Sequence, residues 1–455
     1  MAAIRRIFIA NRGEIAVRII RTCRELGVET VLGVSEADRD SLGAKLATRV
    51  VRIGPARATE SYLRVGTVVE AARATGCDAV HPGYGFLSEN RSLAEACHEY
   101  GLIFIGPDPA NLAAVGDKLT ARSHAEAAGV PLIPGGSVET LEEARRLSDK
   151  MGFPLLIKAV SGGGGRGMKQ VRRADELEEQ FSLAVSEATA AFGDGRVYME
   201  RFVEVGRHVE VQIISDGTSV LHAGERDCSI RRRYQKVVEE APAPCLSEEL
   251  RSGLHEAAVR FARHIGYRSI GTVEFLVDVE RAEFYFLEMN ARIQVEHPVT
   301  EAISGLDLVA SQISIAEGKP LGFSQADIRL EGHAIECRLN AEDIHNDFRP
   351  APGRVTLAWF PSLTALRVDT HLQPGAMIPP HYDSMIAKLI AFGESRDLAI
   401  ETMEKALRVC ALQGVKTNKA LHKAIMADPR FRKGGVDTNY LGGLLPNLVI
   451  EEGSE

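Results

Sequence analysis

Short apolar runs and longer amphipathic stretches alternate along the first hundred residues. The apolar runs predict buried strands at residues 7–10, 29–34, 79–81 and 103–105. The stretches between them predict helices over 14–26, near 61–75 and up to Tyr100, and Gly27 stands where the first helix should end. Strands and helices in alternation are typical of a doubly wound α/β sheet, so we expect a Rossmann-like N-terminal domain over residues 1–105.

Glycine and proline divide the rest of the chain. Gly106, Pro107 and Pro109 follow the last predicted strand, and P-L-I-P-G-G occupies residues 131–136. The domains expected from these breaks are a helical linker over 106–130, a small glycine-rich α+β unit over 131–203, a larger strand-rich lobe over 204–446, and a tail over 447–455. The predicted fold class is therefore multi-domain, combining α/β and α+β parts.

Charge and composition narrow the classes of function. The formal net charge of −8 gives no general attraction to nucleic acid or to anionic membranes, and we expect neither as a partner. No apolar run reaches the roughly 20 residues that span a bilayer, and the start, MAAIRRIFIANRGE, lacks the apolar core of a signal peptide. These features predict a cytoplasmic protein. The seven cysteines are scattered without a C-x-x-C pair, which indicates neither a disulfide framework nor a zinc site.

A glycine-rich loop is the strongest local signal for chemistry. Lys158 ends a predicted strand, and S-G-G-G-G-R-G-M follows at residues 161–168. A lysine and flexible backbone N–H groups can contact phosphate oxygens, so this segment predicts nucleotide binding, with an unstructured loop as the alternative. It is not a Walker A loop, because G-K-[ST] is missing, and the N-R-G-E turn near the N-terminus lacks the G-x-G-x-x-G of dinucleotide sites.

A predicted hairpin supplies candidate metal ligands. Its strands are G-T-V-E-F-L-V-D-V, residues 271–279, and F-Y-F-L-E-M-N, residues 284–290. A turn near Arg281 places Glu274 opposite Glu288, with Asn290 on the same face. Opposed carboxylates call for a cation, and Mg²⁺ accepts such ligands. A slip of one residue would leave an ordinary solvated hairpin face instead.

Two further segments are candidates for binding a small anion. R-I-Q-V-E-H-P, residues 292–298, offers a fixed cation, an amide and a carboxylate, which suffices to bind an anion and to remove a proton from it. A surface salt-bridge cluster is the alternative. The basic stretch 226–236 is either a solvated face or part of an anion pocket, and P-G-Y-G, residues 82–85, is either a ligand loop or a turn.

These segments occur together and in order, and the sequence resembles the biotin carboxylases of the ATP-grasp superfamily along almost its whole length. The matching stretches are IANRGEIAVRIIRTCRELG, HPGYGFLSEN, GDK at 116–118, KAVSGGGGRGM, QKVVEEAPAP, EMNARIQVEHPVTE, GHAIECRLNAED and YDSMIAKLI. Each stretch is weak to moderate evidence alone, and their combination is specific.

The resemblance implies roles for individual residues. The implied ATP contacts are Lys118, Lys158, Gly163, Gly164, Gly165, Glu200, Val203, His208, Glu274 and Glu288. Glu274, Glu288 and Asn290 are the implied ligands of two Mg²⁺ or Mn²⁺ ions. The implied bicarbonate pocket consists of Lys236, Arg292, Gln294, Val295 and Glu296, and biotin is assigned to Tyr84 and Arg338. The implied catalytic set is Lys236, Arg292, Glu296 as general base and Arg338 as the stabiliser of the biotin enolate.

The resemblance also implies a reaction and partners. Bicarbonate and ATP would form carboxyphosphate, and the carboxyl group would pass to biotin on a biotin carboxyl carrier protein. No M-K-M biotin-attachment signature and no carboxyltransferase region occur, so we expect a separate subunit that forms a homodimer and works with a carboxyltransferase subunit, most simply in an acetyl-CoA carboxylase of fatty acid synthesis or otherwise in a pyruvate or other acyl-CoA carboxylase.

The sequence departs from the family pattern at three positions, and two rival functions are alternatives to a biotin carboxylase. Tyr234 replaces the usual histidine or asparagine, Arg231 the usual glutamine, and Ala291 a frequent threonine or serine. A different ATP-grasp ligase would not need the R-I-Q-V-E-H segment together with Arg338. A regulatory homologue without turnover would not need the intact charged set.

Overall fold

The computed structural model describes residues 3–159, 168–232 and 235–447. The chain forms two compact units. Unit 1 consists of residues 1–130, 207–275 and 287–455, and unit 2 of residues 131–206 and 276–286. None of the helices in the described ranges combines the length and the apolar character needed to span a bilayer.

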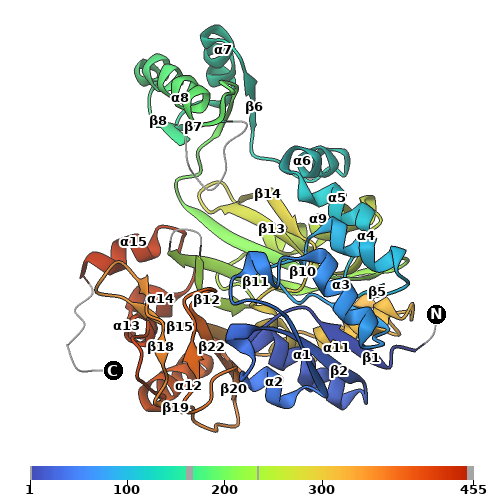
Figure 1. Ribbon diagram of the computed structural model, residues 1–455. Coiled ribbons are helices and arrows are strands. Elements are labelled where there is room, and N and C mark those ends of the chain that lie inside the picture. The colour runs from blue at the N-terminus through green and yellow to red at the C-terminus, as the bar shows by residue number, and fades with distance from the viewer. Residues whose placement is uncertain (1–2, 160–167, 233–234, 448–455) are drawn as a thin grey trace. The chain divides into compact units, whose positions relative to one another are not determined.

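Unit 1 begins with a five-stranded parallel sheet of order β3-β2-β1-β4-β5, of which β1, β2 and β5 are labelled in Figure 1. Its strands are β1 (Arg6–Ile9), β2 (Glu29–Ser35), β3 (Arg49–Gly54), β4 (Ala79–His81) and β5 (Ile103–Phe104). The helices between them are α1 (Gly13–Glu25), α2 (Leu42–Leu46), α3 (Val65–Ala74) and α4 (Arg91–Glu99). Helix α1 buries the face that carries Ile15, Ile19 and Cys23, which repeat every four residues. The predicted doubly wound fold is confirmed.

Strand β3 was not predicted from the sequence. Its residues, RVVRIG, are charged at two positions and only Ile53 is buried. The strand lies at the edge of the sheet, where polar side chains remain in water, so its sequence carries no clear apolar signal.

The second sheet of the chain has eight strands in the order β14-β13-β10-β11-β12-β15-β22-β20. They are β10 (Gly206–Asp216), β11 (Val220–Arg232), β12 (Gln235–Ala241), β13 (Arg268–Asp278), β14 (Glu283–Asn290), β15 (His333–Asn340), β20 (Leu366–Thr370) and β22 (Met385–Gly393). Ten of the eleven residues of β10 are buried, because both faces of the sheet are covered. Helix α9 packs against β11, α10 against β11, β12 and β15, and α12 against β15 and β22.

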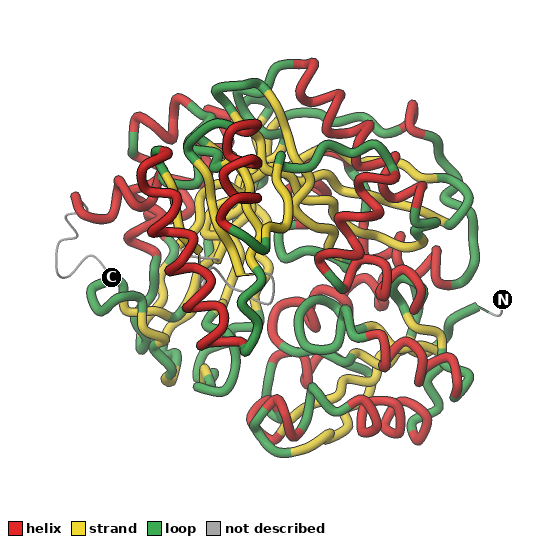
Figure 2. Tube along the Cα trace, turned by 90° about the horizontal axis from the view of Figure 1, so that it is seen from above, coloured by secondary structure: helices red, strands yellow, loops and turns green. Residues whose placement is uncertain are grey.

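Unit 1 also contains further helices and several short strands. The helices of the linker region are α5 (Pro109–Gly116) and α6 (Lys118–Ala127). The later helices are α9 (Glu248–His264), α10 (His297–Ser304), α11 (Leu308–Ala316), α12 (Arg396–Val409), α13 (Lys419–Ala427), α14 (Pro429–Lys433) and α15 (Tyr440–Leu444). The short strands are β16 (Glu342–Asp343), β17 (Arg349–Pro350), β18 (Gly353–Arg354), β19 (Leu357–Trp359), β21 (Met377–Ile378) and β23 (Ala411–Gln413). The colours of Figure 2 show the mixture of helices and strands that the predicted fold class implies.

Unit 2 contains a four-stranded antiparallel sheet of order β6-β9-β7-β8 with two helices. Its elements are β6 (Gly135–Val138), α7 (Leu141–Met151), β7 (Leu155–Ala159), β8 (Met168–Val171), α8 (Leu177–Phe192) and β9 (Val197–Arg201). The end of the β13–β14 hairpin joins this unit: the Phe286 N–H donates to the Pro131 carbonyl, and the Val279 N–H donates to the Val205 carbonyl.

Candidate active site

The centre of the predicted site, in unit 1, is the ammonium group of Lys236 on β12. Its Nζ lies 2.6 Å from Glu210 Oε2, 2.5 Å from Glu296 Oε1 and 3.2 Å from Glu274 Oε1. Burial lowers the pKa of Lys236. The Cys228 thiol and these three carboxyls have the larger, opposite effect, so the pKa lies well above its ordinary value. Lys236 is therefore a permanent cation at neutral pH.

Glu296, the predicted general base, is fully buried at the residue that precedes α10. It accepts hydrogen bonds from Lys236 and, at Oε2, from Arg338 Nη2 at 2.9 Å. Burial alone would raise the pKa of the Glu296 carboxyl, but the charges of Lys236, Arg338 and Arg226 hold it well below its ordinary value. Glu296 is thus ionised and able to accept a proton.

Arg338 on β15 connects this base to a second buried carboxyl. Its guanidinium forms ion pairs with Glu296 and with Glu239 of β12. These neighbours keep the pKa of Arg338 above its ordinary value despite burial. The structure thereby brings together three of the four predicted catalytic residues, which are far apart in the sequence.

The segment 292–296 lies beside the predicted metal ligands. Arg292 donates to Asn290 Oδ1 at 2.6 Å, to Gln294 Oε1 at 3.0 Å and to Glu89 Oε2 at 2.9 Å. Gln294 Nε2 in turn donates to Glu274 Oε1 at 3.1 Å. These hydrogen bonds connect two predicted bicarbonate residues, Arg292 and Gln294, with two predicted metal ligands, Asn290 and Glu274.

The proposed metal ligands Glu274, Glu288 and Asn290 lie on β13 and β14, the two strands of the hairpin expected from the sequence. Asn290 Nδ2 donates to Glu274 Oε1 at 2.9 Å, and burial together with the Glu274 charge raises the pKa of the Glu288 carboxyl. In the described part of the chain no hydrogen bond or ion pair neutralises the Glu288 side chain. Two carboxyls that repel one another and an amide oxygen fit a hard cation such as Mg²⁺ or Mn²⁺.

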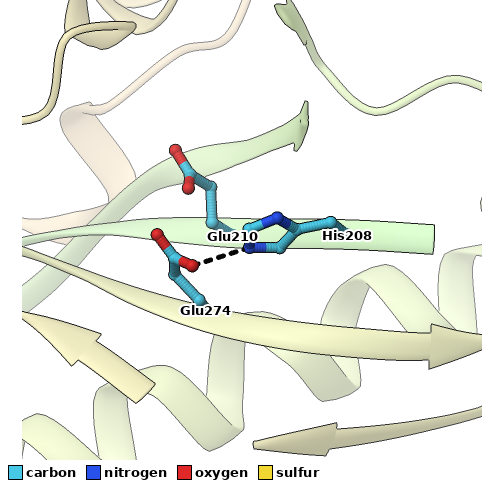
Figure 3. Close-up of side chains that lie close together, drawn as sticks. All are labelled: His208, Glu210 and Glu274. Atoms are coloured by element: carbon cyan, nitrogen blue, oxygen red, sulfur yellow. Dashed lines mark ion pairs between the residues drawn. The ribbon is translucent and has the colours of Figure 1, made fainter. Parts of the chain in front are cut away.

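The carboxylates around Lys236 also belong to two clusters of ligand-type side chains. Two groups have ligand-type atoms within 4.8 Å of one another, namely His208, Glu210 and Glu274, and Glu210, Cys228 and Glu296. Figure 3 shows the first of these, in which His208 Nε2 lies 2.7 Å from Glu274 Oε2. Lys236 Nζ contacts two carboxylates in each group. We therefore interpret both groups as counter-ions of Lys236. His208, predicted as a nucleotide contact, lies against the predicted metal ligand Glu274.

Tyr84, the predicted biotin residue, belongs to the loop after β4. Its hydroxyl donates to Glu14 at the start of α1, and both residues line a cavity of about 170 Å³ together with Tyr382 and Met385. Burial raises the pKa of the Tyr84 hydroxyl well above its ordinary value, and the Glu14 charge adds to the effect. Tyr84 is therefore a neutral hydrogen-bonding group.

The predicted nucleotide residues are divided between the units. Lys118 begins α6 in unit 1, and its charge opposes the rise in the pKa of Glu288. Lys158 on β7 and Glu200 on β9 form an ion pair within unit 2, and the half-buried Val203 follows β9 there. Gly163, Gly164 and Gly165 lie outside the described residues, as does the departure at Tyr234.

The other two departures lie close to predicted site residues. Arg231 pairs with Lys236 across β11 and β12. Ala291 is fully buried, and its N–H donates to Glu89 Oε1 at 3.0 Å.

Several charged residues of the site were missed by sequence reasoning. They are Glu89, Glu210, Glu239 and Lys388, whereas Arg226 belongs to the basic stretch 226–236 for which an anion pocket was one interpretation. Glu89, Glu239 and Lys388 lie within the matched stretches HPGYGFLSEN, QKVVEEAPAP and YDSMIAKLI. The sequence pattern nevertheless gave no reason to expect these three side chains at the site.

Comparison with known proteins identifies the family. The biotin carboxylase N-terminal domain model matches residues 3–112, the ATP-binding domain model of the carbamoyl-phosphate synthase L chain matches 117–324, and the biotin carboxylase C-terminal domain model matches 336–443. The biotin carboxylase of Nostoc sp. is 49% identical over 439 residues, which are 96% of this chain and 98% of the relative. This chain belongs to the biotin carboxylase family.

Members of the biotin carboxylase family serve in different assemblies. A pyruvate carboxylase subunit of Methanothermobacter thermautotrophicus is 47% identical, over 96% of this chain and 89% of the relative. The biotin carboxylase domain dimer of Hydrogenobacter thermophilus 2-oxoglutarate carboxylase, solved with MgADP, ADP and bicarbonate, is 42% identical with a TM-score of 0.90, covering 99% of this chain and 100% of that one. The family and fold predicted from the motifs are thus confirmed.

Proposed function

We propose that the chain catalyses the ATP-dependent carboxylation of biotin on a carrier protein, with bicarbonate as the carbon source. The observation that carries this proposal is the ionised, fully buried Glu296 held between Lys236 and Arg338. A carboxylate in this setting can take a proton, while the two cations attract the anion that loses it.

The first step is the activation of bicarbonate. Glu296 removes the bicarbonate proton, a bicarbonate oxygen attacks the γ-phosphorus of ATP, and the bond to the β-phosphate oxygen breaks, which gives carboxyphosphate and ADP. The low pKa of Glu296 without substrate would make it a weak base. Bicarbonate brings a further negative charge that shares Lys236 and Arg338 with Glu296, so binding raises the pKa of Glu296 toward the range where it accepts a proton.

The second step transfers the carboxyl group. Carboxyphosphate separates into CO2 and phosphate, the phosphate takes the ureido proton of biotin, and the ureido nitrogen bonds to CO2. Arg338 stabilises the negative charge on the ureido oxygen. Tyr84 contacts biotin.

Glu274, Glu288 and Asn290 would hold two Mg²⁺ or Mn²⁺ ions, whose charge offsets that of the nucleotide phosphates. Lys118, Lys158, Glu200, Val203 and His208 are the proposed nucleotide contacts, together with the glycines at 163–165. Arg292, Gln294 and Val295 orient bicarbonate.

The final acceptor depends on partners. The partners that we infer are a biotin carboxyl carrier protein and a carboxyltransferase subunit. We also infer a homodimeric state, and acetyl-CoA carboxylase as the assembly, with a pyruvate or other acyl-CoA carboxylase as the alternative. A relative that is a pyruvate carboxylase subunit supports the alternative. Offering each biotinylated carrier in turn, and measuring carboxybiotin, distinguishes them.

The test of the function is ADP release with Mg²⁺ and bicarbonate, in the presence and absence of free biotin. We expect biotin to stimulate ADP release and Glu296→Gln to lower the stimulated rate at least about 100-fold, because the general base is lost. Glu280→Gln, at an exposed hairpin position, is the matched control and should keep the wild-type rate. A Glu296→Gln enzyme with wild-type stimulation would contradict the assigned base, and absence of stimulation in the wild type would contradict the function.

A further inference from the structure

Lys388 is a buried cation in an otherwise apolar strand. Strand β22 reads MIAKLIAFG, and the Lys388 side chain has 0% exposure. Removal of an ammonium group from water is strongly unfavourable unless partners compensate the charge. The contacts of Lys388 therefore indicate what the residue does.

The partners of Lys388 come from distant parts of unit 1. Its Nζ donates to the Val295 carbonyl at 2.7 Å and lies 3.2 Å from Glu14 Oε1 and 4.0 Å from Asp369 Oδ2. Lys388 is directly opposite Arg338 on β15 and directly opposite Asp369 on β20, strands that flank β22 in Figure 1. Glu14, Glu336 and Asp369 outweigh burial and raise the pKa of Lys388, so the group stays charged.

One of these contacts fixes the predicted base. The Val295 carbonyl belongs to the peptide group that joins Val295 to Glu296, and peptide groups are planar. A hydrogen bond that holds this carbonyl therefore also holds the backbone from which the Glu296 side chain projects into its contacts with Lys236 and Arg338.

The other contact leads to the predicted biotin residue. Glu14 Oε1, which lies 3.2 Å from Lys388 Nζ, also accepts the hydrogen bond from the Tyr84 hydroxyl. Glu14, Tyr84 and Met385, three residues before Lys388, line the same cavity of about 170 Å³. The Lys388 ammonium group thus contacts both the Val295 carbonyl of the bicarbonate segment and the Glu14 carboxyl that binds Tyr84.

We propose that Lys388 is a positioning residue for carboxyl transfer, which holds the Val295–Glu296 peptide on one side and, through Glu14, Tyr84 on the other. The inference rests on the proposed function, which assigns Glu296 to bicarbonate and Tyr84 to biotin. A purely structural ion pair would stabilise the fold without affecting the coupling of the two steps. Misplacement of reacting groups by about 1 Å can lower a rate about 100-fold, so the two roles differ in their kinetic consequences.

The experiment compares Lys388→Met with the wild-type, full-length chain. We expect the KM for bicarbonate to rise at least tenfold and the ratio of carboxybiotin formed to ATP cleaved to fall at least threefold, while the KM for ATP stays within twofold. Lys419→Met is the matched control: Lys419 is also buried, and its Nζ donates to the Cys410 carbonyl at 3.1 Å. It should lose thermal stability and keep both the bicarbonate KM and the ratio.

A double variant separates positioning from stability. Glu14→Gln with Lys388→Met removes both charges, which a buried site tolerates better than the loss of one. The double variant should regain thermal stability but keep the raised bicarbonate KM and the lowered ratio. Wild-type kinetics in either variant, or recovery of the kinetics together with stability, would overturn the positioning role. A wild-type chain without biotin-stimulated ADP release would instead overturn the proposed function, and with it the role of Lys388.

Discussion

Glu239 and Glu336 are directly opposite one another on β12 and β15, and neither side chain is exposed. Like charges in such a pair repel, and burial disfavours ionisation of both. Burial raises the pKa of Glu239 to about 7, against the opposing charge of Arg338, and it raises the pKa of Glu336 well above the ordinary range. This carboxyl pair therefore carries protons at a pH where exposed glutamates do not.

The raised pKa of Glu239 predicts a pH-dependent stability. Because the folded state binds this proton more tightly than the unfolded state, the contribution of Glu239 is fully present below about pH 4.5 and is lost as pH rises to about 7. The free energy of unfolding of Glu239→Gln minus that of the wild type should therefore increase by up to about 3 kcal/mol as pH rises from 4.5 to 7. Urea unfolding at pH 5, 6, 7 and 8 measures the difference, with Glu280→Gln as control. A difference that does not vary with pH would contradict the pKa of Glu239.

The sequence revealed the site residues whose chemistry is concentrated in one segment. Residues 292–296 and the hairpin carboxyls were predicted because their side chains make chemical sense as neighbours in the chain. Lys388 and Glu210 were missed, since a single charge between apolar residues of a strand has the pattern of an outward-facing position. Only the tertiary fold shows that both faces of these strands are buried.

Arg226 connects three strands to α10 at the scale of elements. Its guanidinium is fully buried and donates to Glu210 on β10 at 2.6 Å, to Thr272 on β13 at 3.1 Å and to Thr300 on α10 at 2.9 Å. It thereby compensates the Glu210 carboxylate at Oε1, while Lys236 binds Oε2. The helix that Glu296 precedes is thus attached to the sheet by a charged group.

Removal of Arg226 is expected to be costly. Arg226→Met leaves Glu210 with one cation fewer and should lower the free energy of unfolding by about 3–5 kcal/mol, as found when one partner of a buried pair is lost. Adding Glu210→Gln should restore more than half of this loss. Urea unfolding of both variants measures the effect, and Arg263→Met, an exposed position on α9, is the control. An Arg226→Met protein as stable as this control would show that the buried contacts contribute little.

Elements were predicted well where burial is one-sided or complete. Apart from β3 and α2, the N-terminal strands and helices and the β13–β14 hairpin have clear periodicity and were predicted within a few residues. Unit 2 is different, because the end of the hairpin joins residues 131–206 through non-local contacts such as that of Phe286 with Pro131. A pattern that is local in sequence cannot reveal such an association.

Nucleotide and metal should stabilise the molecule as a whole. A ligand present at about 100 times its Kd raises the free energy of unfolding by about 2.7 kcal/mol. We expect a non-hydrolysable ATP analogue with Mg²⁺ to raise the Tm, and expect a chelator to remove the metal-dependent part of this increase. Glu288→Gln should lose the same part, because a proposed ligand is gone, whereas Glu280→Gln should retain it. A metal-dependent increase that survives in Glu288→Gln would contradict the assignment of Glu288.

The order of the strands in the large sheet has a consequence for biosynthesis. The five-stranded sheet is complete once residue 104 has left the ribosome, but unit 2 needs residue 286, and β22 must still enter between β15 and β20. Since domains fold as units and unit 1 combines the N-terminal sheet with residues 287–455, the pocket around Glu296 can form only when the last fifth of the chain appears. A nascent chain that stalls before β22 therefore exposes the charged residues 292–296 without Lys388, which binds the Val295 carbonyl in the finished protein.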